Sequence, residues 1–173
     1  MWFGIGLLVG ALLAGGTAAT VGVLIQALLP VWPRVVLATG VAVAVAAREL
    51  RLVSFPIPEN RRLVPETVLR RGPIAGAFQF GTEMGTGMRT YSPSALPHLM
   101  LVMIVLVLPF GWGMAAAIGF AVGRWVTALA ASRFPAGPTA WAARWARYSR
   151  LVVGMLAVVV AGFVATALLE AVS

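Results

Sequence analysis

The chain opens with an apolar run, residues 2–29, that contains no charged side chain. A helix needs about 20 predominantly apolar residues to cross the hydrocarbon core of a bilayer, so this run is long enough to span a membrane. Further apolar runs cover residues 34–52, 94–108, 114–131 and 151–169. Helices satisfy their backbone polar groups internally, which lipid cannot do for them. We therefore predict an all-α fold: one polytopic transmembrane bundle of about six helices over residues 1–173.

Composition agrees with a membrane protein and excludes several kinds of chemistry. Hydrophobic residues make up 61% of the chain and charged residues 10%, and the mean hydropathy is +0.96. Soluble domains carry roughly 25% charged residues. The chain has no cysteine, so disulfides, thiolate metal sites and thiol redox chemistry are excluded. We expect no cofactor and no metal, since the single histidine, His98, has no Cys or Asp nearby to complete a set of ligands.

The positive charge of the chain indicates contact with lipid headgroups. Its formal net charge is +8, and every basic residue is an arginine. In a membrane protein, arginines in short loops face anionic headgroups, so we expect the bilayer as partner and no nucleic acid. A membrane-protein partner or a second copy of the chain is a further expectation. The Ala-, Val-, Gly- and Arg-rich composition is typical of GC-rich coding DNA and suggests the cytoplasmic membrane of a bacterium.

A polar stretch, residues 78–94, stands out between apolar flanks, just before the apolar run 94–108. Charged groups and free backbone groups are costly at bilayer depth, so such a segment is expected to line a cavity or a helix contact. A proline-flanked break near 81–97 would open the backbone there. The candidate substrate- or ion-binding residues are Gln79, Glu83, Arg89, Thr90, Ser92, Ser94, His98 and Arg124.

Several residues of this region have two interpretations. Glu83 is either a proton- or cation-carrying carboxylate or one member of a structural ion pair. Arg124 either pairs with Glu83 across the bundle or extends toward a headgroup. His98 either titrates near neutral pH or caps a helix start. Gly81 and Gly85 have the small-xxx-small spacing of close helix packing, which explains them as well as a ligand cavity does.

Two features bear on topology. The sequence Leu-Pro-Val-Trp at 29–32 is echoed by Leu-Pro-Phe-Gly-Trp at 108–112, which suggests inverted three-helix halves, 1–92 and 93–173, unless the likeness is chance.

The loops 48–71 and 132–150 are both Arg-rich, and the second holds an aromatic face typical of a short interfacial helix. Six crossings would place these loops on opposite sides. The positive-inside rule favours one side, which a re-entrant segment near 81–97 and five crossings would allow.

The segment Tyr91-Ser92-Pro93-Ser94-Ala95-Leu96-Pro97 resembles the Pro-Cys-x-x-Pro helix break of the DsbD/CcdA-type thiol electron carriers, in the lysine-exporter-like superfamily. The resemblance implies six membrane helices in two inverted repeats. Ser94 stands where the redox cysteine would be, so thiol electron transfer does not carry over. We expect a transporter-like protein that binds or moves a small solute or ion at this break. The alternative is a non-catalytic subunit or scaffold of a larger membrane complex.

Overall fold

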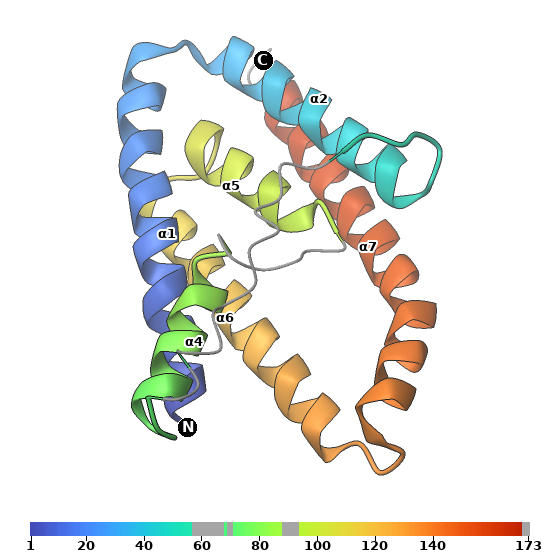
Figure 1. Ribbon diagram of the computed structural model, residues 1–173. Helices are drawn as coiled ribbons and strands as arrows, with labels where there is room; N and C mark the ends of the chain where they lie inside the picture. The colour runs from blue at the N-terminus through green and yellow to red at the C-terminus, as the bar shows by residue number, and fades with distance from the viewer. Residues whose placement is uncertain (57–67, 69–70, 88–93, 171–173) are drawn as a thin grey trace.

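The structure is a computed structural model that describes residues 1–56, 68, 71–87 and 94–170. Six helices order this part of the chain, and no strand occurs in it. They are α1 (Trp2–Leu28), α2 (Val31–Glu49), α4 (Ala75–Gly85), α5 (Leu96–Leu106), α6 (Phe110–Arg133) and α7 (Gly137–Glu170), as drawn in Figure 1. The predicted all-α fold is confirmed.

Three helices, α1, α2 and α6, are long and apolar enough to cross a membrane. The two helices of the polar stretch are much shorter. With 11 residues each, α4 and α5 rise only about 16 Å, roughly half of the hydrocarbon thickness. Neither short helix can cross a bilayer by itself.

Two helices begin earlier than the apolar runs 34–52 and 114–131 suggested, because prolines start them. Pro30 is the N-cap of α2 with φ −55° and ψ 157°, and Pro109 is the N-cap of α6 with φ −56° and ψ 153°. Pro33 lies within the first turn of α2, where a missing N–H removes no hydrogen bond. The prolines of the two echoed segments therefore adopt nearly the same backbone conformation.

The last helix also differs from the expectation. The sequence suggested a short interfacial helix followed by a separate span from residue 151, whereas α7 runs without interruption over 34 residues. Its start is marked by Gly137, in the left-handed region at φ +84°, followed by Pro138. No further Pro or Gly occurs before Gly154, so nothing in the chain breaks the helix between them.

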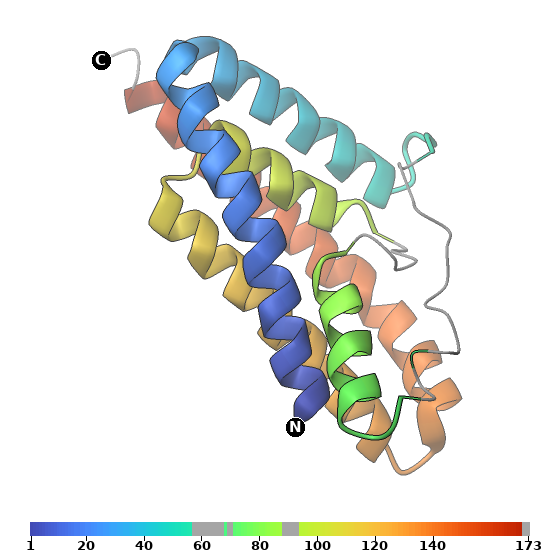
Figure 2. The same ribbon diagram turned by 60° about the vertical axis from the view of Figure 1, so that its left-hand side comes forward.

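The buried side chains form two separate cores. The first core joins α2 to α5 and consists of Val35, Ala38, Ala42, Val45, Ala95, Leu99, Met103 and Leu106. The second core joins α1 to α6 and α4 around Leu7, Ala11 and Ala121. Figure 2 shows α4 beside the N-terminal half of α1 and α5 beside its C-terminal half. In Figure 1, α7 lies along α2.

Glycines on both sides bring α1 and α4 into backbone contact. A Cβ atom added at Gly6 of α1 would collide with the carbonyl oxygen of Phe78, and one added at Gly81 would collide with the α1 backbone. Gly10 and Gly85 repeat this arrangement one turn further along. Small residues four apart allow such close approach between membrane helices. The structure therefore supports the packing reading for Gly81 and Gly85, and Gly85 also lines a cavity.

We expect Gly6→Ala to lower stability, because the new methyl group meets fixed backbone and must push α4 away. Overpacking of this kind costs about 1–3 kcal/mol. Gly119→Ala is the matched control, since nothing lies within 4 Å of its added Cβ and alanine favours a helix. Thermal unfolding in detergent, followed by circular dichroism, measures both. Equal melting temperatures for the two variants would contradict the close α1–α4 contact.

Candidate functional site

The break between the two short helices is the site that the sequence singled out. α4 ends at Gly85, and Gly87 follows in the left-handed region at φ +69°, which favours glycine. α5 begins at Leu96 with Ala95 as its N-cap. Three predicted site residues, Arg89, Thr90 and Ser92, lie outside the described residues.

A hydrogen-bonded row of polar side chains leads along α4 toward this break. The Arg71 guanidinium donates to Gln79 Oε1 at 2.8 Å, and Gln79 Nε2 donates to Glu83 Oε1 at 3.2 Å. Because the Gln79 oxygen is taken by Arg71, an N–H donor of the amide meets the Glu83 carboxylate. Arg71 is exposed, whereas Gln79 and Glu83 are half-buried. The row thus connects the protein surface to a carboxylate in the last turn of α4.

The start of α5 is held by a carboxylate from another helix. Glu49, the last residue of α2, accepts a 2.6 Å hydrogen bond from the backbone N–H of Ala95 and forms an ion pair with Arg48 at 3.3 Å. Ser94 Oγ accepts a second bond, from the Leu96 N–H at 3.2 Å. The first turn of α5 has no acidic residue of its own. Glu49 therefore supplies the negative charge that a helix N-terminus favours.

The end of α5 is held by donors from α1 and α2. Gln26 Nε2 donates to the carbonyl oxygens of Val105 and Leu108, at 3.2 and 3.1 Å, with a longer contact to that of Ile104. Arg34 donates from a terminal guanidinium nitrogen to the Leu106 carbonyl oxygen at 3.1 Å. A cation and an amide thus meet the C-terminal carbonyls, where the helix dipole is negative.

One helix, α2, therefore holds both ends of α5. Arg34 near its start faces the end of α5, and Glu49 at its end faces the start, so the two helices run antiparallel. Glu49, Arg34 and Gln26 were not among the predicted site residues. One signal was present: the predicted helix at 94–108 has neither an acid at its start nor a base at its end. Gln26 is also the one amide side chain in the run 2–29.

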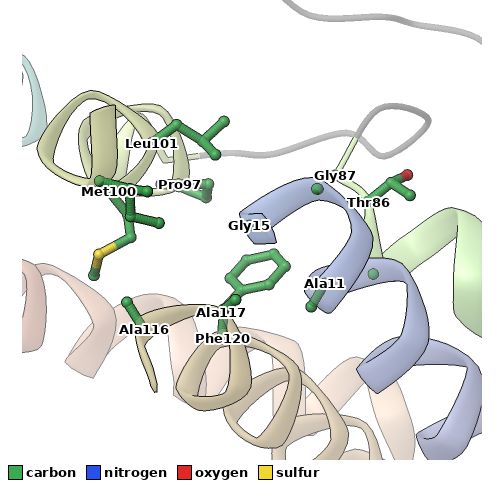
Figure 3. Close-up of a pocket in the computed structure, with 13 residues that line it drawn as sticks. Ala11, Gly15, Thr86, Gly87, Pro97, Met100, Leu101, Ala116, Ala117 and Phe120 are labelled. Carbon is green, nitrogen blue, oxygen red and sulfur yellow. The ribbon is translucent and has the colours of Figure 1, made fainter. Parts of the chain in front are cut away.

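A cavity of about 60 Å³ lies at the break, among α1, α4, α5 and α6. Figure 3 shows the Phe120 ring of α6 at its centre, with Thr86 and Gly87 on one side and Met100 on the other. Thr86 carries the one polar side chain of the lining. Its hydroxyl bonds to the backbone carbonyl of Glu83 at 2.8 Å. The cavity lies beside the polar stretch, but its walls are apolar and include none of the predicted site residues.

The two remaining candidates lie close to this cavity. His98 sits half-buried in the first turn of α5, next to the lining residue Pro97, and its Nδ1 atom is buried. Arg124 of α6 places its guanidinium carbon 5.4 Å from the ring centre of Phe120. A cation over an aromatic face is an attractive contact, so Arg124 is tied to the cavity wall through Phe120. Its pairing with Glu83 stays a prediction.

Neither a metal cluster nor a known relative names the chemistry of the site. Within the described residues, no three His, Asp or Glu side chains gather closely enough to hold a metal ion. No protein-family model, curated protein or solved structure matches the chain. The features that bear on function are therefore the helix break, its cavity and the polar side chains around them.

We expect Glu49→Ala to destabilise the fold by about 1–3 kcal/mol, because it leaves the Ala95 N–H without its acceptor. Glu49→Gln keeps an oxygen acceptor and removes only the charge at the helix end, a change worth about 0.3–1 kcal/mol. Melting temperatures in detergent give the comparison. If the alanine and glutamine variants melt together, Glu49 does not hold α5 through this hydrogen bond.

Proposed function

We propose that this chain is a multi-pass protein of a bacterial cytoplasmic membrane, with transporter-like architecture, that binds or moves a small solute or ion at the α4–α5 break. The observation that carries the proposal is a pair of short helices that meet beside a cavity, one of them held at both ends by other helices. Transporters place their sites at discontinuous helices, and broken backbone is tolerated at membrane depth only where protein or water covers it.

The arrangement of the two cores supports this proposal. The cavity lies where α5, packed on α2, faces the group formed by α1, α4 and α6. A small rocking of one group against the other would change access to the cavity, which is the motion expected of alternating access. The two groups contact each other mainly where α5 lies against α1. This contact includes Gly22, whose added Cβ would lie 2.8 Å from the Ile104 carbonyl oxygen, and the Gln26 hydrogen bonds.

The proposal includes the internal repeat of two halves and the relation to the DsbD/CcdA-type proteins. The matching conformations of Pro30 and Pro109 at the starts of α2 and α6 favour two related halves. The lengths of α4 and α5 favour a broken or re-entrant segment near 81–97 over six uninterrupted crossings. On this plan the chain is a cysteine-less relative of the DsbD/CcdA-type proteins, with Ser94 in place of a redox thiol.

The side chains near the break favour a proton or a small cation as the species moved. Glu83 is the acid on the cavity side of the polar row, and Arg124 on α6 would be its counter-ion. About 60 Å³ has room for a few waters or one small solute. Gln79, Ser94 and His98 would complete the polar surroundings, together with Thr90 and Ser92. An ionisable residue within a membrane segment is costly and is by default a functional candidate.

A flux assay in liposomes tests this role. Protein-containing liposomes are given an imposed gradient of H⁺, Na⁺ or K⁺ and are loaded with a dye that is sensitive to the ion under test. We expect Glu83→Gln to lower the ion flux to that of protein-free liposomes, because the amide cannot carry a proton or attract a cation. Glu83→Asp should keep part of the flux.

Glu170→Gln, the same substitution at the end of α7, is the matched control and should leave the flux unchanged. Unchanged flux in Glu83→Gln would remove Glu83 from the mechanism. Absence of flux in the wild-type protein for all three ions would reject ion transport.

A second candidate function, a non-catalytic subunit of a larger complex, is favoured by one face of α6. Gly111, Ala115, Gly119 and Gly123 recur every four residues and are exposed. The three glycines have nothing within 4 Å of an added Cβ. Co-purification from native membranes separates the two functions: a stoichiometric partner together with no flux supports the subunit.

A further inference from the structure

The corner where α6 passes into α7 carries an aromatic cluster that the proposed function does not use. The ring centres of Phe134 and Trp141 lie 5.6 Å apart, and those of Trp141 and Trp145 lie 6.0 Å apart in a stacked arrangement. Trp145 and Tyr148 are 43% and 50% exposed. The cluster is thus ordered by its own ring contacts yet presents aromatic surface to the outside.

Arginine is fixed within this cluster. The Arg144 guanidinium carbon lies 5.9 Å from the ring centre of Phe134, and the Arg144 side chain is exposed. A guanidinium over a ring face keeps its in-plane N–H donors for oxygen acceptors, and its planar fork matches a phosphate group. Arg133, also exposed, ends α6 at the same corner.

The charge of this segment is one-sided. Residues 132–150 contain Arg133, Arg144, Arg147 and Arg150 and no acidic residue. Because the segment has no acidic residue to neutralise these arginines, we expect their anionic partners to come from outside it. The corner lies at the end of α6, a helix suited to span a membrane, and Figure 1 places it at the lower end of the molecule, away from the α5 break. Trp and Tyr gather at that depth because their rings suit the headgroup region.

We propose that the α6–α7 corner is a binding site for the phosphodiester headgroup of an anionic phospholipid. Arg144, positioned by Phe134, would bind the phosphate oxygens, Arg133 would add charge, and Trp141 with Trp145 would lie against the glycerol and upper acyl region. This site is independent of transport at the break, since it uses neither the cavity nor Glu83.

Thermal unfolding of the full chain in detergent micelles tests the proposal. The probes are dioleoylphosphatidylglycerol, dioleoylphosphatidylcholine and inorganic phosphate, each added over a range of concentrations. We expect the phosphatidylglycerol alone to raise the melting temperature. Arg144→Gln should raise the lipid concentration needed for half of the shift about fivefold, the effect of one arginine near an anionic surface.

Arg51→Gln is the matched control, because Arg51 is an exposed arginine of the other Arg-rich segment, and it should behave like the wild type. If Arg144→Gln does not fold, Arg133→Gln tests the same site, with a shift in the same direction. Equal stabilisation by both lipids, an unchanged lipid requirement in the corner variants, or an equal shift with inorganic phosphate alone would each overturn the proposal.

Discussion

The structure depends on satisfying the two ends of the short helix α5. An α-helix leaves four N–H groups and four carbonyls without partners at its ends, and inside a bilayer water cannot supply them. Here a carboxylate meets the N-terminus, and a guanidinium and an amide meet the C-terminus. The signs of these charges agree with the helix dipole at both ends. Because Glu49 and Arg34 both belong to α2, the direction and position of α2 against α5 follow from the same requirement.

The rest of the bundle is assembled by close backbone approach. Gly6 and Gly81 let α1 and α4 touch without intervening side chains, which places the last turn of α4 next to residues 7–11 of α1. This contact carries the row from Arg71 to Glu83 up to the break. The cavity lies where α5, packed on α2, meets α1, α4 and α6.

Part of the site was predictable from local spacing. Gln79 and Glu83 are four residues apart on one helix, so their side chains were bound to be neighbours. The sequence predicted a break at Pro93 and Pro97, whereas α4 already ends at Gly85 and Pro97 lies in the first turn of α5; Pro93 lies outside the described residues. The partners of α5 were not predictable, because Glu49 and Ala95 are 46 residues apart in the chain and Gln26 and Leu108 are 82 apart. No periodicity within one helix reports a contact of that range.

The sequence by itself determined the helical class and the apolar runs able to span a membrane, because these follow from hydropathy. Only the tertiary structure decided that Glu49 and Arg34 cap a different helix, that Gly81 serves packing and that the cavity at the break is apolar. These outcomes depend on which helix faces lie against each other. The apolar faces are nearly uniform, so their burial alone does not specify which of them pack together. Glycine contacts and long-range hydrogen bonds select the pairing.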